Sequence, residues 1–438
     1  MDKSVDGLGL TRRDVIKASI GAAAAALASS AFASKALAQA GQKITILVSQ
    51  PQVGGAQIVA DAFKQATGVE VEIVAAPLDQ IQQQLTLDLQ SGAKRFDAFD
   101  FWYVSKGALA KQGILLDLTD RIEKDKAEIK PEDYIPSVYD PYSLYEGRRY
   151  SLPFDGDTHA LFYNKEILER NGVEPPKTWD ALVEASKKIT AAESAKGIYG
   201  IAIIGVKAPI LNISIYANRL ANYGGTFLDD AGKPSLNTDA ALMAAENLMA
   251  TVPYALPTPA ETGFEQALTA FIGGKAAMTE GWIDLGTYAE DPKNSQIAGK
   301  WAVVPLPVGG SVKASRAPLN AGWTMGVAAY SQKQDIAWEF IKLASSAAMG
   351  LKLITTTGTG IDPFRISNLN DPKYAAFNAQ SQRAAASSLN GAVGWPSVPE
   401  APRMLEALSE QLAAMVAGET QPKDALAQTQ AAWERLLG

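Results

Sequence analysis

A short acidic segment carries the residues of this chain that are best suited to chemistry. Asp155 and Asp157 flank Gly156, and His159, the single histidine of the sequence, follows them. Pro153 favours extended backbone before the segment, and the apolar run after it has the length of a buried strand. We expect a tight polar turn here, in which Gly156 can take a positive φ without steric cost. Such a turn would direct the two carboxylates and the imidazole toward a gap between two strand systems.

Two carboxylates at this spacing allow more than one kind of chemistry. A pair of carboxyl groups about 5–9.5 Å apart can act as the acid and base of a glycoside hydrolase. Carboxylates that accept hydrogen bonds from hydroxyl groups can instead hold a sugar without cleaving it. Hydrolase carboxylates normally come from different strand ends, which favours the binding interpretation. A solvated acidic turn without a function is the third alternative.

Composition excludes several other kinds of site among the 438 residues. Without cysteine, the sequence offers no disulfide, no catalytic thiol, no thiolate metal ligand and no lipid-modified cysteine. One histidine cannot build a zinc site with several imidazoles, and the sequence contains neither a phosphate-binding glycine loop nor a G-x-S-x-G turn. The net charge of −7 gives no indication of nucleic acid as a partner. We therefore expect neither a metal nor a cofactor.

The first 40 residues resemble an export signal rather than part of a fold. A twin-arginine pattern occupies residues 11–17, an alanine-rich apolar run follows, and residues 38–40 form an A-x-A cleavage motif. Serine and glycine interrupt the apolar run and Lys35 ends it, so it is a poor membrane span. The sequence predicts export to the periplasm by the Tat pathway, cleavage after Ala40 and no lipid anchor.

The first part of the mature chain has the pattern of a parallel sheet. The predicted strands are 44–48, 69–74 and 96–102, and the predicted helices between them are 54–67 and 77–91. This β-α-β-α-β order with short connections favours right-handed crossovers. Ligands of such sheets bind beyond the carboxyl ends of the strands. The sequence places Gln50, Gln52 and Trp102 at those ends.

A second unit of the same kind follows the acidic segment. Its predicted strands are 161–164, 199–204, 276–280 and 301–307, with helices between them. A later strand at 325–329 and its following helix would complete the first sheet, which requires a second crossing, and residues 358–363 would provide a third. The predicted organisation is two α/β lobes joined by a hinge of several segments. Lobe 1 comprises 43–153 and 323–358, and lobe 2 comprises 154–322 and 359–438.

The eight tryptophans divide into two groups by position. Four are expected to pack in cores: Trp179, Trp301, Trp338 and Trp433. The other four stand at strand ends or in loops, where an aromatic ring can cover the apolar face of a sugar: Trp102, Trp282, Trp323 and Trp395. Hydroxyl groups would be satisfied by Asp155, Asp157 and Asp284, with Asn320 and Arg365 as further candidates. His159 fits either a ligand contact or a hinge residue.

Several motifs in this order resemble the family 1 extracellular solute-binding proteins, the maltose-binding-like components of ABC importers. They are YSLPFDGDT at 150–158, LFYNK at 161–165, PPKTWD at 175–180, FIGGKAAM at 271–278 before Gly281-Trp282, and Gly322-Trp323 before AWEFIK at 337–342. No single motif is specific, but together they span nearly all of residues 44–437.

The resemblance implies the periplasmic-binding-protein fold (type II), with a sugar-type ligand in the cleft between the lobes. It also implies a monomer that closes around its ligand and delivers it to a membrane permease, and no catalysis. The matched motifs belong mostly to the scaffold, so the ligand stays open. A polyol, another small solute, or an acidic or sulfonated sugar near Arg365 is the main alternative, and a secreted glycoside hydrolase is a remote one.

Overall fold

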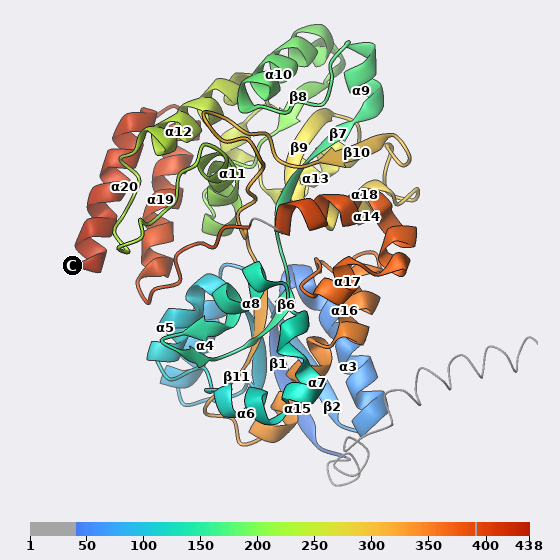
Figure 1. The fold of residues 1–438 in the computed structure, drawn as a ribbon, viewed down its shortest axis with the longest axis vertical. Coiled ribbons are helices and arrows are strands. Elements are labelled where there is room, and N and C mark those ends of the chain that lie inside the picture. Colours follow the sequence, from blue (N-terminus) through green and yellow to red (C-terminus); the bar gives the residue numbers. More distant parts are fainter. Residues whose placement is uncertain (1–40, 390–391) are drawn as a thin grey trace, which may run out of the picture.

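The computed structural model describes residues 41–389 and 392–438. The chain forms two α/β lobes, each built on its own sheet, and they lie one above the other in Figure 1. The two-lobed α/β arrangement predicted from the sequence is confirmed. The predicted export signal, residues 1–40, lies outside the described residues. No helix of the described ranges is long and apolar enough to cross a membrane.

Lobe 1, the lower lobe in Figure 1, is built on a sheet of order β2-β1-β3-β11-β6. Its strands are β1 (Lys43–Ser49), β2 (Glu70–Ala76), β3 (Ala98–Trp102), β6 (Leu152–Asp155) and β11 (Trp323–Val327). As predicted, β1 pairs in parallel with β2 and β3, whereas β11 runs antiparallel to β3 and to β6. The C-terminal ends of β1, β3 and β6 and the N-terminal end of β11 therefore lie side by side at the same end of the strands.

Helices on both faces of this sheet form the rest of lobe 1. They are α3 (Val53–Thr67), α4 (Ile81–Gln90), α5 (Lys106–Lys111), α6 (Thr119–Lys124), α7 (Lys126–Ile129), α8 (Pro136–Ser143), α15 (Gln334–Ala344) and α16 (Ala347–Ile354). α3 is followed by Gly68, whose φ of 73° lies in the left-handed region that commonly ends a helix. α4 begins four residues later than predicted because Pro77 and Gln80 form a turn before it.

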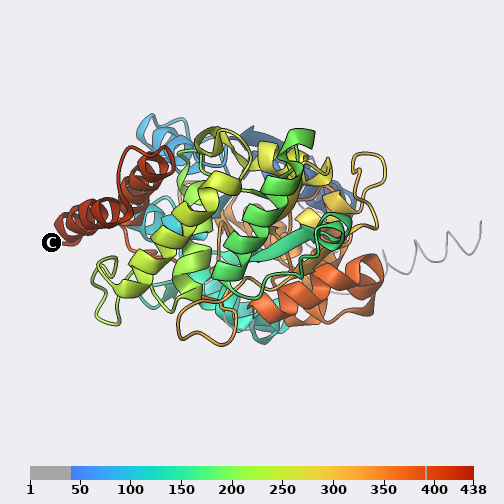
Figure 2. The same cartoon turned by 90° about the horizontal axis from the view of Figure 1, so that it is seen from above.

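Lobe 2 is built on a sheet of order β10-β7-β9-β8. Its strands are β7 (His159–Asn164), β8 (Tyr199–Ala202), β9 (Ala276–Trp282) and β10 (Trp301–Val304). Its helices are α9 (Lys165–Arg170), α10 (Trp179–Glu193), α11 (Pro209–Asn222), α12 (Asp239–Thr251), α13 (Phe264–Ile272), α14 (Leu285–Ala289), α18 (Pro372–Leu389), α19 (Ala401–Val416) and α20 (Pro422–Leu437). Figure 2 looks onto this lobe and shows its green helices lying over the sheet.

Three segments join the lobes, as the sequence predicted, and a fourth passes between them. The first crossing, residues 156–158, joins β6 to β7, and the second, residues 305–322, joins β10 to β11. The third, residues 355–365, leads from α16 to the short helix α17 (Ile366–Leu369). The fourth segment, residues 392–400, which we call the strap, precedes α19 and contacts lobe 1 near β3. The strap was not predicted from the sequence.

Candidate ligand-binding site

The first crossing is held against the third by a close backbone approach. A Cβ atom on Gly156 would lie 2.0 Å from the carbonyl oxygen of Pro363, and the Gly156 N–H donates to Asp362 O at 3.3 Å. Gly156 does not adopt a positive φ. The expectation of a left-handed turn residue was therefore wrong. Glycine is needed at this position for space, because two crossing segments touch there.

Four aspartates gather where these crossings meet the lobes. Asp155 Oδ2 accepts from Gln52 Nε2 at 2.9 Å, and its Oδ1 accepts from the Asp362 N–H at 2.7 Å. Asp362 Oδ2 accepts from the Ile283 N–H at 3.1 Å, just before Asp284. Asp157 lies on the first crossing and is also buried. The first crossing, the third crossing and the end of β9 thus bring these four carboxyl groups together, and we call them the acidic cluster.

Burial raises the pKa of the carboxyl groups in this acidic cluster. Desolvation raises the pKa of Asp155, Asp157 and Asp362 well above the ordinary value, and the charges of neighbouring aspartates raise it further. Desolvation also raises the pKa of Asp284 to about 6. Burial and mutual repulsion thus favour the protonated form of these carboxyl groups, in which a carboxyl can donate as well as accept a hydrogen bond.

Aromatic rings from both lobes and the strap surround the cluster. Trp102 of lobe 1 and Trp395 of the strap meet edge to face with ring centroids 5.3 Å apart, and Trp395 also contacts Phe227 of lobe 2 at 5.5 Å. Trp282 meets His159 edge to face at 4.3 Å and donates from Nε1 to Asn320 O at 3.3 Å. The strap therefore bridges the two lobes through Trp395.

Two more aromatic residues, Trp323 and Tyr142, lie at the same end of the lobe 1 strands. Trp323, the first residue of β11, pairs with Trp102 on one side and with Asp155 on the other. Tyr142 of α8 stacks on Tyr103 with centroids 4.6 Å apart. Its hydroxyl occupies the space that a Cβ on residue 322 would need, which explains the glycine before Trp323.

Several buried polar atoms in this region have no hydrogen-bond partner among the described residues. They are Gln52 Oε1, Trp102 Nε1, Tyr142 Oη, His159 Nε2, Asn320 Oδ1 and Trp395 Nε1. Buried polar groups are normally paired, so a group of orphans at one place needs an explanation. The set contains donors and acceptors, and it comes from both lobes, the second crossing and the strap. We interpret it as the set of atoms that contact a bound solute.

A polar network on the lobe 2 side holds His159. Asn218 of α11 lies 2.9 Å from His159 Nδ1 and donates to Glu280 Oε2 at 2.8 Å. Glu280 forms a fully buried ion pair with Arg219 at 2.8 Å. Asn218 also accepts from Asn320 Nδ2 at 2.9 Å, which connects the network to the second crossing.

The structure brings together most of the residues predicted from the sequence as site residues. The residues in or beside the cluster are Gln52, Trp102, Asp155, Asp157, His159, Trp282, Asp284, Asn320, Trp323 and Trp395. Gln50 is exposed and makes none of these contacts. The four tryptophans expected in cores are buried: Trp179, Trp301, Trp338 and Trp433.

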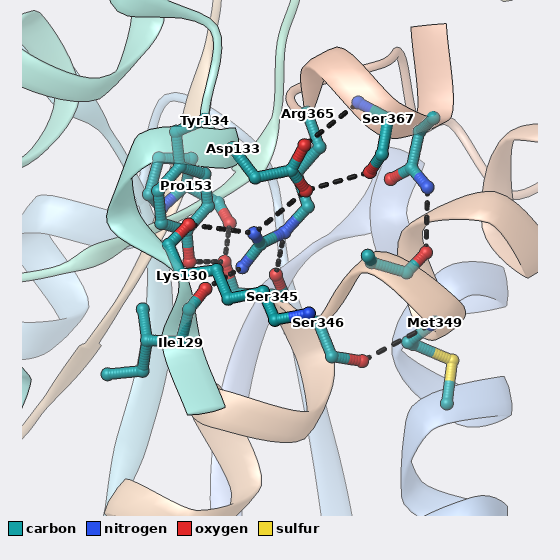
Figure 3. Close-up of polar contacts among 12 residues, drawn as sticks. Ile129, Lys130, Asp133, Tyr134, Pro153, Ser345, Ser346, Met349, Arg365 and Ser367 are labelled. Carbon is teal, nitrogen blue, oxygen red and sulfur yellow. Dashed lines mark hydrogen bonds and ion pairs between the residues drawn. The ribbon is translucent and has the colours of Figure 1, made fainter. Parts of the chain in front are cut away.

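Arg365 does not belong to this site, and its place among the candidates is corrected. Its guanidinium donates to Ser345 O at 2.7 Å and Ile129 O at 2.9 Å, and it pairs with Asp133 at 3.3 Å (Figure 3). It also lies 4.0 Å above the ring of Tyr134. These partners tie the third crossing to lobe 1, so Arg365 has a structural role at the hinge.

Sequence reasoning missed four residues of the site: Tyr142, Asn218, Phe227 and Asp362. One signal was available for Asp362, since it lies in the segment predicted as the third crossing. Another was available for Asn218, because the largely apolar helix α11 carries several polar residues. They are Asn212, Ser214, Asn218, Arg219 and Asn222, and all of them are buried. Nothing in the local sequence marked Tyr142 or Phe227.

This arrangement is suited to a polyhydroxylated solute. Each hydroxyl group can donate one hydrogen bond and accept others, which matches a site that mixes carboxyl groups, amide oxygens and indole N–H groups. No group of three or more His, Cys, Asp or Glu residues within 41–389 and 392–438 could hold a metal ion. The two buried arginines Arg219 and Arg365 are each paired with a carboxylate, Glu280 and Asp133 respectively.

Comparison with known proteins agrees with this architecture. Residues 50–350 match the family model described as bacterial extracellular solute-binding protein. A probable amino-acid ABC transporter periplasmic-binding protein of Sinorhizobium fredii is 27% identical, covering 94% of this chain and 93% of that one. A mannitol-binding protein of Pseudomonas aeruginosa is 24% identical over 74% of each chain. The crystal structure of an ABC transporter solute-binding protein from Agrobacterium radiobacter in complex with ribitol superposes with a TM-score of 0.82, at 27% identity, over 91% of this chain and 99% of that one.

Proposed function

Because the chain belongs to the bacterial extracellular solute-binding protein family, we propose that it captures a neutral sugar or polyol between its lobes and delivers it to the membrane permease of an ABC importer. One observation carries the choice of ligand. Six buried hydrogen-bonding atoms, both donors and acceptors, lie without a partner beside aromatic rings and carboxyl groups. A small polyhydroxylated solute can satisfy both kinds of atom at once.

The charges around the site favour a neutral solute over an anionic one. Four aspartates line the crossings, and the nearby arginines Arg219 and Arg365 are neutralised by Glu280 and Asp133. A carboxylate or sulfonate ligand would add a negative charge to a buried cluster in which desolvation and mutual repulsion already disfavour ionised carboxyl groups. This argues against the acidic or sulfonated sugar. It argues equally against an amino acid, the solute named for the Sinorhizobium relative, because its carboxylate would add the same charge.

The proposed cellular role follows from the sequence and from the family. The twin-arginine pattern and the A-x-A motif of residues 1–40 support export by the Tat pathway. The absence of cysteine from the sequence supports a protein that diffuses freely in the periplasm, without a lipid anchor. We propose a monomer that binds its solute unchanged. Formation of a cleaved product during prolonged incubation with a bound sugar would contradict the binding role and revive the hydrolase alternative.

A thermal-shift screen of residues 41–438 tests the choice of ligand. The panel contains ribitol, D-mannitol, neutral mono- and oligosaccharides, sulfonated and acidic sugars, and amino acids. A ligand stabilises the folded state by RT ln(1 + [L]/Kd), so we expect a raised melting temperature with a neutral polyol or sugar. A response confined to amino acids or to acidic sugars would overturn the proposal.

Two variants with matched controls test the site itself. Trp102→Phe and Trp395→Phe keep an aromatic ring but remove an unpartnered indole N–H. We expect each to weaken Kd about tenfold or more, because a buried acceptor left unpaired costs about 1–3 kcal/mol. Trp338→Phe removes the same group from α15, where it binds Asp125 at 2.7 Å. This control should lower stability yet leave Kd unchanged, and equal losses in all three variants would contradict the assignment.

A further inference from the structure

We infer that Asn218 is a positioning residue that fixes His159 as a neutral Nε2–H donor toward the bound solute. The inference deepens the proposed function and rests on it for the nature of the ligand. If it holds, the solute must offer an acceptor oxygen opposite His159.

The first step is the charge state of Glu280. Its Oε1 lies 2.8 Å from Arg219 Nη1, and the two side chains are 1% and 0% exposed. A guanidinium stays protonated in proteins, so its buried partner is an ionised carboxylate. An ionised carboxylate only accepts hydrogen bonds.

The second step fixes the orientation of the Asn218 amide. Glu280 Oε2 lies 2.8 Å from the amide nitrogen and requires a donor there. On its other side the amide oxygen accepts from Asn320 Nδ2 at 2.9 Å. Exchanging the nitrogen and oxygen of Asn218 would place an oxygen against a carboxylate and lose both hydrogen bonds. The two neighbours therefore allow one orientation only.

The third step assigns the imidazole proton. The same amide nitrogen lies 2.9 Å from His159 Nδ1. An NH₂ group donates and does not accept, so Nδ1 must carry a lone pair and the ring proton must sit on Nε2. Burial also lowers the pKa of His159 to about 3, which keeps the ring neutral at physiological pH. His159 is thus a donor at Nε2 and nowhere else.

The consequence concerns specificity. His159 Nε2 is buried and has no partner among the described residues, and its edge-to-face neighbour is Trp282, whose own N–H is used by Asn320. A solute that offers a hydroxyl oxygen at this position satisfies the N–H. An analogue with hydrogen in place of that hydroxyl leaves the N–H unpaired and is rejected.

Nuclear magnetic resonance can test this directly, because His159 is the only histidine in the sequence. The mature chain, residues 41–438, is labelled with ¹⁵N-histidine and purified without a histidine tag. We expect Nδ1 to give an unprotonated and Nε2 a protonated signal, unchanged between pH 5 and 8. The opposite tautomer, a mixture of tautomers, or titration with an ordinary histidine pKa would overturn the inference, whether or not a ligand is known.

Variants separate the positioning role from a merely structural one. Asn218→Asp replaces the donor by an acceptor, so the ring proton should move to Nδ1 and Kd for the binding polyol should weaken about tenfold or more. Asn212→Asp is the matched control, since Asn212 is equally buried on α11 but contacts Ser409. It should retain the Nε2–H tautomer. Retention of that tautomer in a folded Asn218→Asp protein would also overturn the inference.

The ligand part has its own readout. Ribitol is the first probe, followed by the neutral compounds of the thermal-shift panel. A bound compound should move the Nε2 signal and leave Nδ1 in place. Tight binding that moves neither signal would overturn the contact with His159. Failure of every neutral compound to bind would contradict the proposed function, while the tautomer of the free protein would still decide the role of Asn218.

Discussion

Gly156 shows how a single position can join the parts of this hinge. It has no side chain to contribute, yet its Cα lies against the carbonyl of Pro363 so closely that a methyl group would overlap it. The contact locks the first crossing to the third. The neighbouring Asp155 then reaches the N–H of Asp362 at 2.7 Å. The position of the carboxylate therefore depends on the absence of a side chain one residue later.

Gly156→Ala should disturb this junction. Because the new methyl group would meet Pro363 O at 2.0 Å, we expect a loss of about 1–3 kcal/mol in the free energy of unfolding, as for overpacking elsewhere. The measurement is chemical denaturation of the mature chain. Gly394→Ala is the control, since its methyl group would meet Pro141 at an ordinary 3.7 Å. Equal stability of the two variants would show that the crossings are not held by this contact.

At the residue scale, the sequence predicted the site where local signals exist. Tryptophans and carboxylates at strand ends, such as Trp102 and Asp155, were found because ligands of α/β sheets bind at those ends. Arg365 was misassigned because its partner Asp133 lies 232 residues earlier in the chain, and no local pattern reveals such a pairing. Asn218 was missed for a related reason, since its role depends on Glu280 and His159, which come from two other elements.

At the scale of elements, β1 and β3 are tied together beside the site by one buried carboxyl group. The Ser49 N–H donates to both oxygens of Asp100 at 2.9 and 3.1 Å, and the Ser49 hydroxyl donates to it at 3.3 Å. Burial raises the pKa of Asp100 to about 8, against about 3.9 for an unfolded chain. Between these two pKa values the unfolded chain releases the Asp100 proton more readily than the folded protein does. Raising the pH through this range therefore destabilises the folded state.

Asp100 should accordingly make stability fall as pH rises from about 4 to about 8, whereas His159, whose pKa is lowered to about 3 by burial, acts in the opposite direction below about pH 6.5. A carboxyl whose pKa is raised by folding stabilises the protein fully below its unfolded pKa, and this contribution is lost on approach to the folded pKa. Asp155, Asp157 and Asp362 contribute in the same direction. Asp100→Asn keeps the shape of the side chain and should reduce the slope without abolishing it. Denaturation at several pH values measures the effect.

The control for this pH dependence is Asp230→Asn, which removes one charge from an exposed position. It should retain the full slope of the parent protein. The explanation fails if Asp100→Asn and the parent protein lose stability equally over this pH range.

Sequence periodicity predicted these elements better than it predicted their connections. The strands and helices of both lobes follow from apolar patterns and helix-ending glycines, and β1, β2 and β3 pair in parallel as expected. The strap at residues 392–400 could not be predicted. It has no regular pattern, and its position depends on long-range contacts such as the Trp395 N–H to Tyr103 Oη, 292 residues apart.

At the scale of the whole molecule, contacts among the lobes and the hinge bury the site. Residues from both lobes and the hinge bury one another: Gln52, Asp155, His159 and Asn320 are at most 2% exposed. Because these residues are buried, we expect the lobes to separate when a solute enters, and we expect the solute to favour closure by as much as it binds the closed state more tightly. The strap participates because Trp395 contacts Trp102 on one side and Phe227 on the other.

Trp395→Ala should therefore impair closure itself. The radius of gyration of the mature chain, measured by small-angle X-ray scattering, should fall when the parent protein binds its solute. We expect a smaller fall in the variant at the same solute concentration, because each aromatic pair contributes about 0.5–1.5 kcal/mol beyond its buried area. Trp338→Ala, on α15 of lobe 1, should show the parent behaviour. An unchanged fall in Trp395→Ala would remove the strap from the closing mechanism.

The strand order of lobe 1 also has a consequence for how the chain is made. The lobe 2 sheet is drawn from one continuous stretch, β7 to β10, whereas β11 enters the lobe 1 sheet between β3 and β6. β3 ends at Trp102 and β11 begins at Trp323. At about 5–20 residues per second, the ribosome needs on the order of 10–40 s to supply the missing strand. During that interval β3, and β6 once it has been made, each have an unpaired edge, so the sheet that starts first in the sequence is completed after the sheet of lobe 2.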